Sequence, residues 1–351
     1  AAIAEQSSKR YIAMTCQTND KTAEQDYLDF VEKIEPEEKQ CSFRLAKALS
    51  DHPHRVNLPP KRYVVFTRDS ALEVELFRPE NVALETETTK LGQQYQKLIG
   101  GLAVQFDGEE RTLVQMGRYL EETDRARRQE AWELVANRRL EEAETIDGQL
   151  DSLAKRRNQM SANAGFPNYR DFAHRRKGRF DYTPDDCLAF HDAIEQEMVP
   201  LLRELHDERQ AALGIKSLKP WDTATDPQGR PPLKPFDEVP QLISRTQAIF
   251  DQLDGDLAGW FQTMQDLDLL DLANRKGKAP GGYQDSLAEA RLPFIFMNSV
   301  GVQRDVETLL HEAGHAFHTM ACQDEPLHSY RHAPIEFCEV ASMAMELLGG
   351  E

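Results

Sequence analysis

The sequence predicts a mainly α-helical protein with one small β-sheet. Long stretches such as residues 123–160 carry apolar residues three, four or seven positions apart, which places them on one face of a helix. Runs typical of strands are few and short. The chain has 351 residues, more than a single ordinary core holds, so we expect two lobes, 1–175 and 176–351. Their boundary is placed loosely within 165–185.

The first lobe is expected to begin with both strands and helices. Residues 11–18 and 62–77 contain β-branched and aromatic residues, which strands favour. The stretch between them, about 20–50, has helical character and is interrupted near Pro36. We therefore predict two strands that flank a broken helical region.

The remainder of the first lobe is predicted to hold a hairpin and a pair of long helices. Two short strand-like runs in 102–114 flank Asp107-Gly108, a pair typical of a two-residue turn. Helical spacing then continues through 123–160, where a coiled-coil adaptor is the alternative. Arg139 and Arg157 interrupt the apolar seam, which favours a long helical hairpin inside a larger domain.

The second lobe is predicted to be helical around a proline-dense connection. A helix over 184–213 begins at Thr183-Pro184, a cap followed by a first-turn proline. Six prolines lie within 220–240, and helical character returns over 237–275. A basic, glycine-rich turn is expected over 275–282.

The most informative segment, 306–320, reads VETLLHEAGHAFHTM and contains H-E-x-x-H at His311, Glu312 and His315. On a helix, residues four apart share one face, so both imidazoles can reach a single metal ion. Zn²⁺ binds imidazole readily and lowers the pKa of a coordinated water to about 7, which Glu312 can then deprotonate. A chance match on a charged helix face is the alternative. The apolar neighbours of the motif predict a buried helix instead, where unpaired polar groups are costly.

The third ligand is not determined by the motif. Ala321 stands where a third histidine would follow in one class of such enzymes, so a downstream glutamate is expected. The segment 335–348, after Pro334, is strongly helical and supplies several. The candidates are Glu325, Glu336, Glu339 and Glu346, with His318, His328 and His332 as alternatives.

The run Leu292–Met297 is short and apolar, and its proline predicts a strand at the edge of a sheet. An extended peptide can add to such an edge through backbone hydrogen bonds. A buried core strand is the alternative that the sequence leaves open. Gly281 and Gly282 would allow a backbone to approach closely.

Composition excludes several classes of protein. The net charge of −18 argues against nucleic acid as a partner, and no run reaches the length of a membrane-spanning helix. Five widely spaced cysteines without C-x-x-C are typical of free thiols in a reducing compartment. Together with the absence of a visible secretory signal, this predicts a cytoplasmic protein.

Several separate segments resemble oligoendopeptidase F and its thimet-oligopeptidase relatives. They cover residues from about 75 onward and include ELFRPENVAL, NYRDFAHRRKGRFDYTPDDC, PWDTATDPQGRPPLKPF, GGYQDS, LPFIFMN, DVETLLHEAGHAFH and EFCEVASMAMELL. The resemblance implies a large helical zinc-peptidase fold with a small β-sheet edge beside the H-E-x-x-H helix. It also implies one Zn²⁺ per chain, held by His311, His315 and Glu339, with Glu312 as the general base.

The same resemblance implies further roles. It favours a substrate-binding edge that includes Gly282, Phe296 and Asn298, and a helical cavity that admits only oligopeptides. We expect Glu346, two turns after Glu339, to accept a hydrogen bond from a metal-bound histidine. Members of the family continue past the helix that bears the third ligand, so we expect a chain incomplete at its C-terminus.

The leading hypothesis is a zinc-dependent metalloendopeptidase that hydrolyses short peptides. The alternatives are a helical metal-binding protein and an incomplete peptidase without activity. All four positions of the expected centre are present, including Glu312, which a purely structural metal site does not need. This favours the enzyme. Cleavage preference, physiological substrate and oligomeric state are not determined by the sequence.

Overall fold

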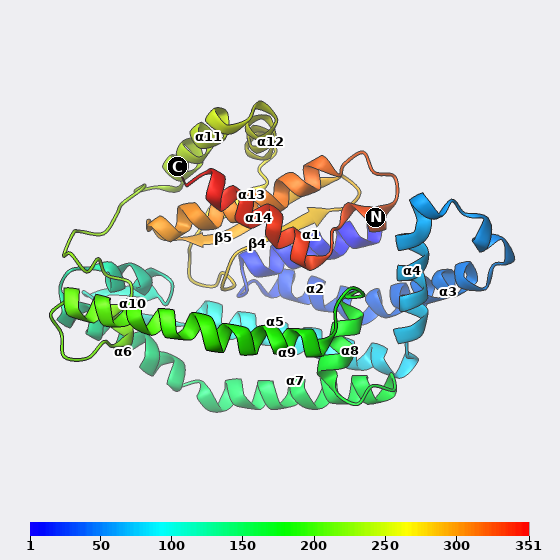
Figure 1. Cartoon of the computed structure of the whole chain (residues 1–351), viewed down its shortest axis with the longest axis horizontal. Helices are drawn as coiled ribbons and strands as arrows, with labels where there is room; N and C mark the ends of the chain where they lie inside the picture. Colours follow the sequence, from blue (N-terminus) through cyan, green and yellow to red (C-terminus); the bar gives the residue numbers. More distant parts are fainter. Residues whose placement is uncertain (351) are drawn as a thin grey trace.

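The computed structural model describes residues 1–350, most of which lie in helices, with one long connection between α10 and α11 (Figure 1). The helices of the first half are α1 (Ala2–Cys16), α2 (Lys21–Lys33), α3 (Glu35–Asp51), α4 (Pro60–Leu76), α5 (Pro79–Gly101), α6 (Arg125–Leu140), α7 (Ala143–Asn163) and α8 (Tyr169–Arg176). Those of the second half are α9 (Pro184–Ala193), α10 (Val199–Ala212), α11 (Val239–Leu253), α12 (Gly255–Asp266), α13 (Gln303–Ala321) and α14 (Ile335–Leu348). The strands are β1 (Ala103–Phe106), β2 (Glu109–Thr112), β3 (Leu270–Ala273), β4 (Tyr283–Leu287) and β5 (Leu292–Ser299).

Several helices begin at a side chain that satisfies the first free backbone N–H groups. Asp20, Asp124 and Asp254 accept such hydrogen bonds at the starts of α2, α6 and α12. Thr183 forms a reciprocal capping box at the start of α9, as its position before a proline predicts. Local sequence therefore explains where these helices start.

The two strands predicted near the N-terminus are wrong, because residues 11–18 and 62–77 lie almost entirely in α1 and α4. In α1, Tyr11 and Met14 are three apart and pack on Tyr27 of α2, so they require helical spacing. Packing between helices thus overrides the local preference of these residues for strands.

Most other predicted elements are confirmed. The hairpin β1–β2 turns at Asp107 and Gly108, both with positive φ, as the dipeptide predicts. Residues 123–160 form the helices α6 and α7, but the predicted hairpin is wrong, because α7 packs along α5 and not along α6. The helix over 184–213 is α9 and α10 joined by a π-helical turn. That turn lies just before Pro200, which has no N–H to donate. The helix predicted over 237–275 ends early, because its last residues form β3.

A three-stranded sheet lies beside α13, with the order β3-β5-β4. Strand β5 is parallel to β3 and antiparallel to β4. The prediction of β5 as an edge strand is therefore wrong, and the edge strands are β3 and β4. Pro293 is tolerated because β3 pairs with β5 only from Ile295 onward, where the Ile295 N–H donates to Leu269. An N–H at residue 293 would point to the same side as that of Ile295, at a position that β3 does not reach. Proline therefore costs no hydrogen bond of the sheet there.

Helices cover both faces of this sheet (Figure 1). On one face, Gln284 and Ser286 of β4 contact Thr319 of α13. On the other, Tyr283 contacts Thr15 of α1 through their hydroxyl groups, which lie 2.6 Å apart. The alternation follows from the two-residue period of a strand. The sheet is thus held between the first helix of the chain and the H-E-x-x-H helix.

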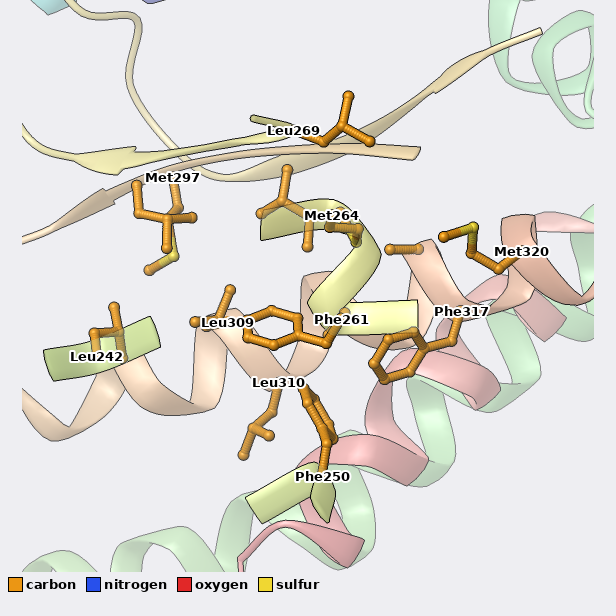
Figure 2. Packing of buried hydrophobic residues seen from close by; sticks show 14 of the residues in the cluster. Leu242, Phe250, Phe261, Met264, Leu269, Met297, Leu309, Leu310, Phe317 and Met320 are labelled. Carbon is orange, nitrogen blue, oxygen red and sulfur yellow. The ribbon is translucent and has the colours of Figure 1, made fainter. Parts of the chain in front are cut away.

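The largest hydrophobic core lies between the sheet, α11, α12 and α13 (Figure 2). Phe250 of α11 contacts both Phe261 of α12 and Phe317 of α13, with ring centroids 5.2 and 4.8 Å apart. Leu309 of α13 and Met297 of β5 are also buried there. This core fixes α13 against the sheet by burying nearly a whole face of the helix.

Among residues 1–350, no helix is long and apolar enough to cross a bilayer. The division into lobes near residue 175 stays a prediction. Contacts between α1 and β4 nevertheless join the N-terminal part of the chain to the sheet beside α13.

Candidate metal centre

Helix α13 carries the H-E-x-x-H motif on a segment anchored at its start and buried along one face. Asp305 accepts hydrogen bonds from the backbone N–H groups of Val300, Gly301 and Val302, at 2.7, 2.7 and 3.0 Å. This carboxylate holds the loop that leads from β5 into the helix. The buried residues Leu309 and Ala313 then face the core, and the motif lies on an adjoining side.

Three potential ligand groups converge beside the motif. The rings of His311 and His315 lie 4.9 Å apart, and Oε2 of Glu339 lies 3.4 Å from Nε2 of His311 and 3.8 Å from Nε2 of His315. One ligand atom from each of the three residues lies within 4.8 Å of the others. Two imidazoles and one carboxylate form a donor set that suits Zn²⁺ in hydrolytic sites.

The other candidates for the third ligand have different partners. Glu336 and Glu346 lie on the same helix as Glu339 but point to other groups, described below. Glu325 pairs with Arg62, and His318 faces Sγ of Cys322 at 3.7 Å. Of the four candidate glutamates, Glu339 is the one that the structure brings to both histidines of the motif.

Gly314, one of the two variable positions in the motif, lets α14 approach α13 closely. A Cβ added at Gly314 would lie 2.6 Å from Cα of Ser342 and 2.7 Å from the carbonyl oxygen of Ala341. Ser342 is fully buried, and its hydroxyl donates to Oε2 of Glu339 at 3.2 Å. The absence of a side chain at residue 314 therefore determines how near Glu339 comes to the histidines.

Glu346 lies beside the first histidine of the motif, as predicted from its place on the helix. Its Oε1 is 2.6 Å from Nδ1 of His311. With Nδ1 donating to this carboxylate, Nε2 of His311 has its lone pair directed toward Glu339 and His315. The contact thus orients the His311 ring, and we propose that this is its role.

Glu312 is only 7% exposed and has no basic side chain among its hydrogen-bond partners in the described residues. Burial raises its pKa to about 7, with a further increase from Glu339, while His311 and the backbone N–H of Gln284 lower it. Burial also lowers the pKa of His315, which favours the neutral, metal-binding form. A carboxyl group that titrates near neutral pH is well suited to move a proton.

The edge strand β4 begins beside Glu312. A Cβ at Gly282 would lie 3.4 Å from Oε1 of Glu312, so the backbone at residue 282 lies directly beside this carboxylate. Because Ile295 directs its N–H toward β3, its antiparallel partner Gln284 directs its backbone groups away from the sheet. The predicted role of Gly282 in substrate binding therefore remains a proposal, supported by its place at this edge.

Phe296 and Asn298 lie behind this edge and not on it. Phe296 is fully buried, with its ring stacked on Tyr283 at 4.7 Å and Nζ of Lys278 at 4.4 Å from its centre. Asn298 donates to the carbonyl oxygens of Ala279 and Gly281, both at 2.8 Å. These contacts support the turn before β4, so direct contact with substrate is not proposed for either residue.

Two residues near this centre were not among the predicted site residues. Arg179 and Tyr182 both donate to Oε1 of Glu336 in the first turn of α14. Both residues lie in the sequence GRFDYT, which belongs to one of the segments that resemble oligoendopeptidase F. The spacing of residues in that segment does not indicate a contact with residue 336. A contact between residues about 155 apart in the chain requires the tertiary structure.

Comparison with known proteins agrees with this geometry. The family model described as Peptidase family M3 matches residues 118–351. An oligoendopeptidase F homologue from Lactococcus lactis subsp. lactis (strain IL1403) is 26% identical over 155 residues, which are 44% of this chain and 25% of that protein.

Solved structures extend the similarity over nearly the whole chain. A PZ peptidase A bound to an inhibitor is 31% identical and has a TM-score of 0.92, covering 97% of this chain and 60% of its own. An X-ray structure assigned as oligoendopeptidase F has 28% identity and a TM-score of 0.94, covering 98% and 61%. The chain thus spans about 60% of the length of these structures. The family match over more than half of the chain, around a centre of two histidines and a glutamate, shows that this protein belongs to peptidase family M3.

Proposed function

We propose that this protein is a zinc-dependent metalloendopeptidase that hydrolyses short peptides. The observation that carries the proposal is the meeting of His311, His315 and Glu339 directly beside the buried carboxyl of Glu312. These three residues would hold the ion. When bound, Zn²⁺ acts as a Lewis acid toward a peptide carbonyl and makes water more acidic.

Glu312 would act as the general base and then as the general acid. Its buried carboxylate beside the three ligand groups could take a proton from water and return it to the leaving amine. The backbone N–H of Gln284 in β4 faces this carboxylate and lowers its pKa. A purely structural metal site would not need a buried acid in this position, which favours the enzyme over a metal-binding protein without activity.

The β4 edge offers a place for an extended peptide beside Glu312. The backbone carbonyl of Gln284 faces away from the sheet and could accept a hydrogen bond from a peptide added as a further antiparallel strand, whereas its N–H faces Glu312. At Ser286 the corresponding groups are already used, because its carbonyl accepts from Ser8 of α1 and its N–H donates to Asp285. The available edge is therefore short and can pair with only a few residues of a peptide.

The five cysteines are free in the structure. Free, partly accessible thiols are typical of proteins in a reducing compartment. We therefore also propose a cytoplasmic location, which can be tested by fractionating cells that express the protein with a compartment marker.

The decisive experiment compares Glu312→Gln with Glu307→Gln, a glutamate on the same helix that pairs with Arg304. Glu312→Gln should retain zinc, measured by elemental analysis, and lose about 10²- to 10⁴-fold in the hydrolysis of quenched peptides. Glu307→Gln should behave as wild type. Retained activity in Glu312→Gln would refute its role, and bound zinc without hydrolysis in the wild type would favour the metal-binding alternative.

A series of peptides of increasing length addresses the substrate class. Hydrolysis should be efficient for short peptides and should fall for long or folded ones. Equal rates for short peptides and an unfolded protein would show a general protease, and release of single terminal residues would show an exopeptidase.

A further inference from the structure

Glu336 connects the helix that carries Glu339 to a distant part of the chain. It lies in the first turn of α14, one helical turn before Glu339. Nε of Arg179 donates to its Oε1 at 2.7 Å, and the hydroxyl of Tyr182 donates to the same oxygen. Two donors on one carboxylate oxygen, one of them charged, define the position of that side chain more closely than a single surface ion pair does.

The segment that supplies both donors is itself anchored. The Tyr182 ring packs edge-on against His174 of α8, with centroids 5.2 Å apart. Phe180, between the two donors, lies under the guanidinium groups of Arg68 and Arg175, at 4.1 and 4.7 Å. Thr183, directly after Tyr182, begins α9 through its capping box. The segment 179–183 is therefore fixed to α4, α8 and α9.

Helix α14 has little other support near its start. Ser342 is its one buried residue, two turns further on, whereas Ile335 and Phe337 are largely exposed. The side chain of Glu339 is 49% exposed, and the hydroxyl of Ser342 is its hydrogen-bond donor. The position of Glu339 thus depends on where the first turns of α14 lie.

We propose that Glu336 is a positioning residue whose contacts with Arg179 and Tyr182 hold the start of α14, and with it Glu339, at the metal centre. The inference rests on the proposed function, because it assumes that Glu339 is a metal ligand. It would explain how a segment about 155 residues before Glu336 contributes to the centre. The alternative is an ion pair that contributes only to stability, as many partly exposed pairs do.

The test measures zinc affinity by competition with a chelator, and the visible absorption spectrum of the Co²⁺-substituted protein. Glu336→Ala should weaken zinc binding about tenfold and change the cobalt bands, because the carboxylate ligand is displaced. Glu336→Gln, which keeps an oxygen for Tyr182 but loses the charge, should have a smaller effect. Excess zinc should restore most of the hydrolytic activity of both variants.

Two controls separate positioning from general stability. Glu325→Gln removes the ion pair between Glu325 and Arg62, which also joins distant segments but does not involve α14. This variant should leave zinc affinity unchanged. In a double-mutant cycle, Arg179→Met combined with Glu336→Gln should weaken zinc binding no more than the stronger single variant.

Three outcomes would overturn the inference. Wild-type zinc affinity and an unchanged cobalt spectrum in folded Glu336→Ala would leave only a surface ion pair. A raised KM at full zinc occupancy in the Arg179 variant would show contact with substrate instead. If Glu339→Ala loses zinc but Glu336→Ala does not, the positioning role of Glu336 is refuted and the proposed function stands. A wild type that binds no zinc would refute the proposed function itself.

Discussion

Helices α13 and α14 both supply the centre, but the rest of the molecule holds them in different ways. Nine residues of α13 are buried, including Leu309 and Phe317 in the main core. In α14 the one buried residue is Ser342, and Phe337 is 66% exposed. Helix α13 is covered by the core on one side and by α14 on another, whereas α14 packs along α13 and has its other faces largely exposed.

This difference teaches how the two halves of one centre can be specified. The histidine half is set by helical periodicity within a buried helix, so its geometry follows from the core. In our proposal the glutamate half depends on three contacts between different segments, namely the Glu336 contacts with Arg179 and Tyr182, the close approach at Gly314, and the pairing of Glu346 with His311. Each contact can be removed separately.

The largest effects should come from the ligands themselves. Both His315→Ala and Glu339→Ala should lose more than roughly 100-fold in zinc affinity, beyond the range typical of residues behind the ligands. Without metal, Glu339→Ala should change the free energy of unfolding by less than about 0.5 kcal/mol, because its side chain is half exposed. His315→Ala should destabilise more, because this side chain packs in the better-buried helix. Chelator competition and urea unfolding measure the two quantities, and tight zinc binding by Glu339→Ala would contradict the assignment.

The next effect concerns the metal-free protein and pH. Burial raises the pKa of Glu312 from its ordinary 4.5 to about 7, so folding favours the protonated carboxyl. Its contribution to stability is therefore full below about pH 4.5 and is lost as pH rises through about 7, a change of about 3 kcal/mol.

The measurement is the difference in unfolding free energy between wild type and Glu312→Gln, from pH 4 to 8, with a chelator present. Taking the difference removes the contribution of the histidines to the pH dependence. Their lowered pKa values make the folded state more stable as pH rises, opposite to the effect of Glu312. A difference that does not vary with pH would contradict the predicted titration of Glu312.

A smaller effect is expected where the two helices meet. In Gly314→Ala the new methyl group would lie 2.6 Å from Cα of Ser342, so α14 must shift. We expect a loss of about 1–3 kcal/mol in stability and weaker zinc binding. Gly259→Ala in α12, where a Cβ meets nothing within 4 Å, should instead stabilise by about 0.5–1 kcal/mol. Unchanged zinc affinity in Gly314→Ala would show that the close approach does not position Glu339.

The smallest effect should follow from Glu346→Gln. The amide can still accept a hydrogen bond from Nδ1 of His311 but carries no charge, so zinc affinity should fall about tenfold. The exposed charge of Glu307 serves as the matched control, because Glu307→Gln changes the same charge without touching either histidine. Equal zinc affinities in the two variants would mean that Glu346 does not orient His311.

Much of the fold could be predicted because the signals are local. The turn at Asp107-Gly108 and the cap at Thr183 depend on neighbours in the chain, and both are confirmed. The strand preference of residues 11–18 was misleading, because α1 forms to bury Tyr11 and Met14 against α2. Likewise, the proline in β5 indicates an edge strand, yet β5 is central. The proline is tolerated there because β3 pairs with β5 only beyond Pro293.

The sequence by itself determined the half of the centre that lies within one helix. The spacing of His311, Glu312 and His315 places three groups together on any helix, whatever surrounds it. Four candidate glutamates follow in the chain, and periodicity does not distinguish which one reaches the histidines. Only the tertiary structure decided for Glu339, because the choice depends on how closely α14 packs at Gly314 and where its first turn is held. These are contacts between segments distant in sequence, which no local pattern records.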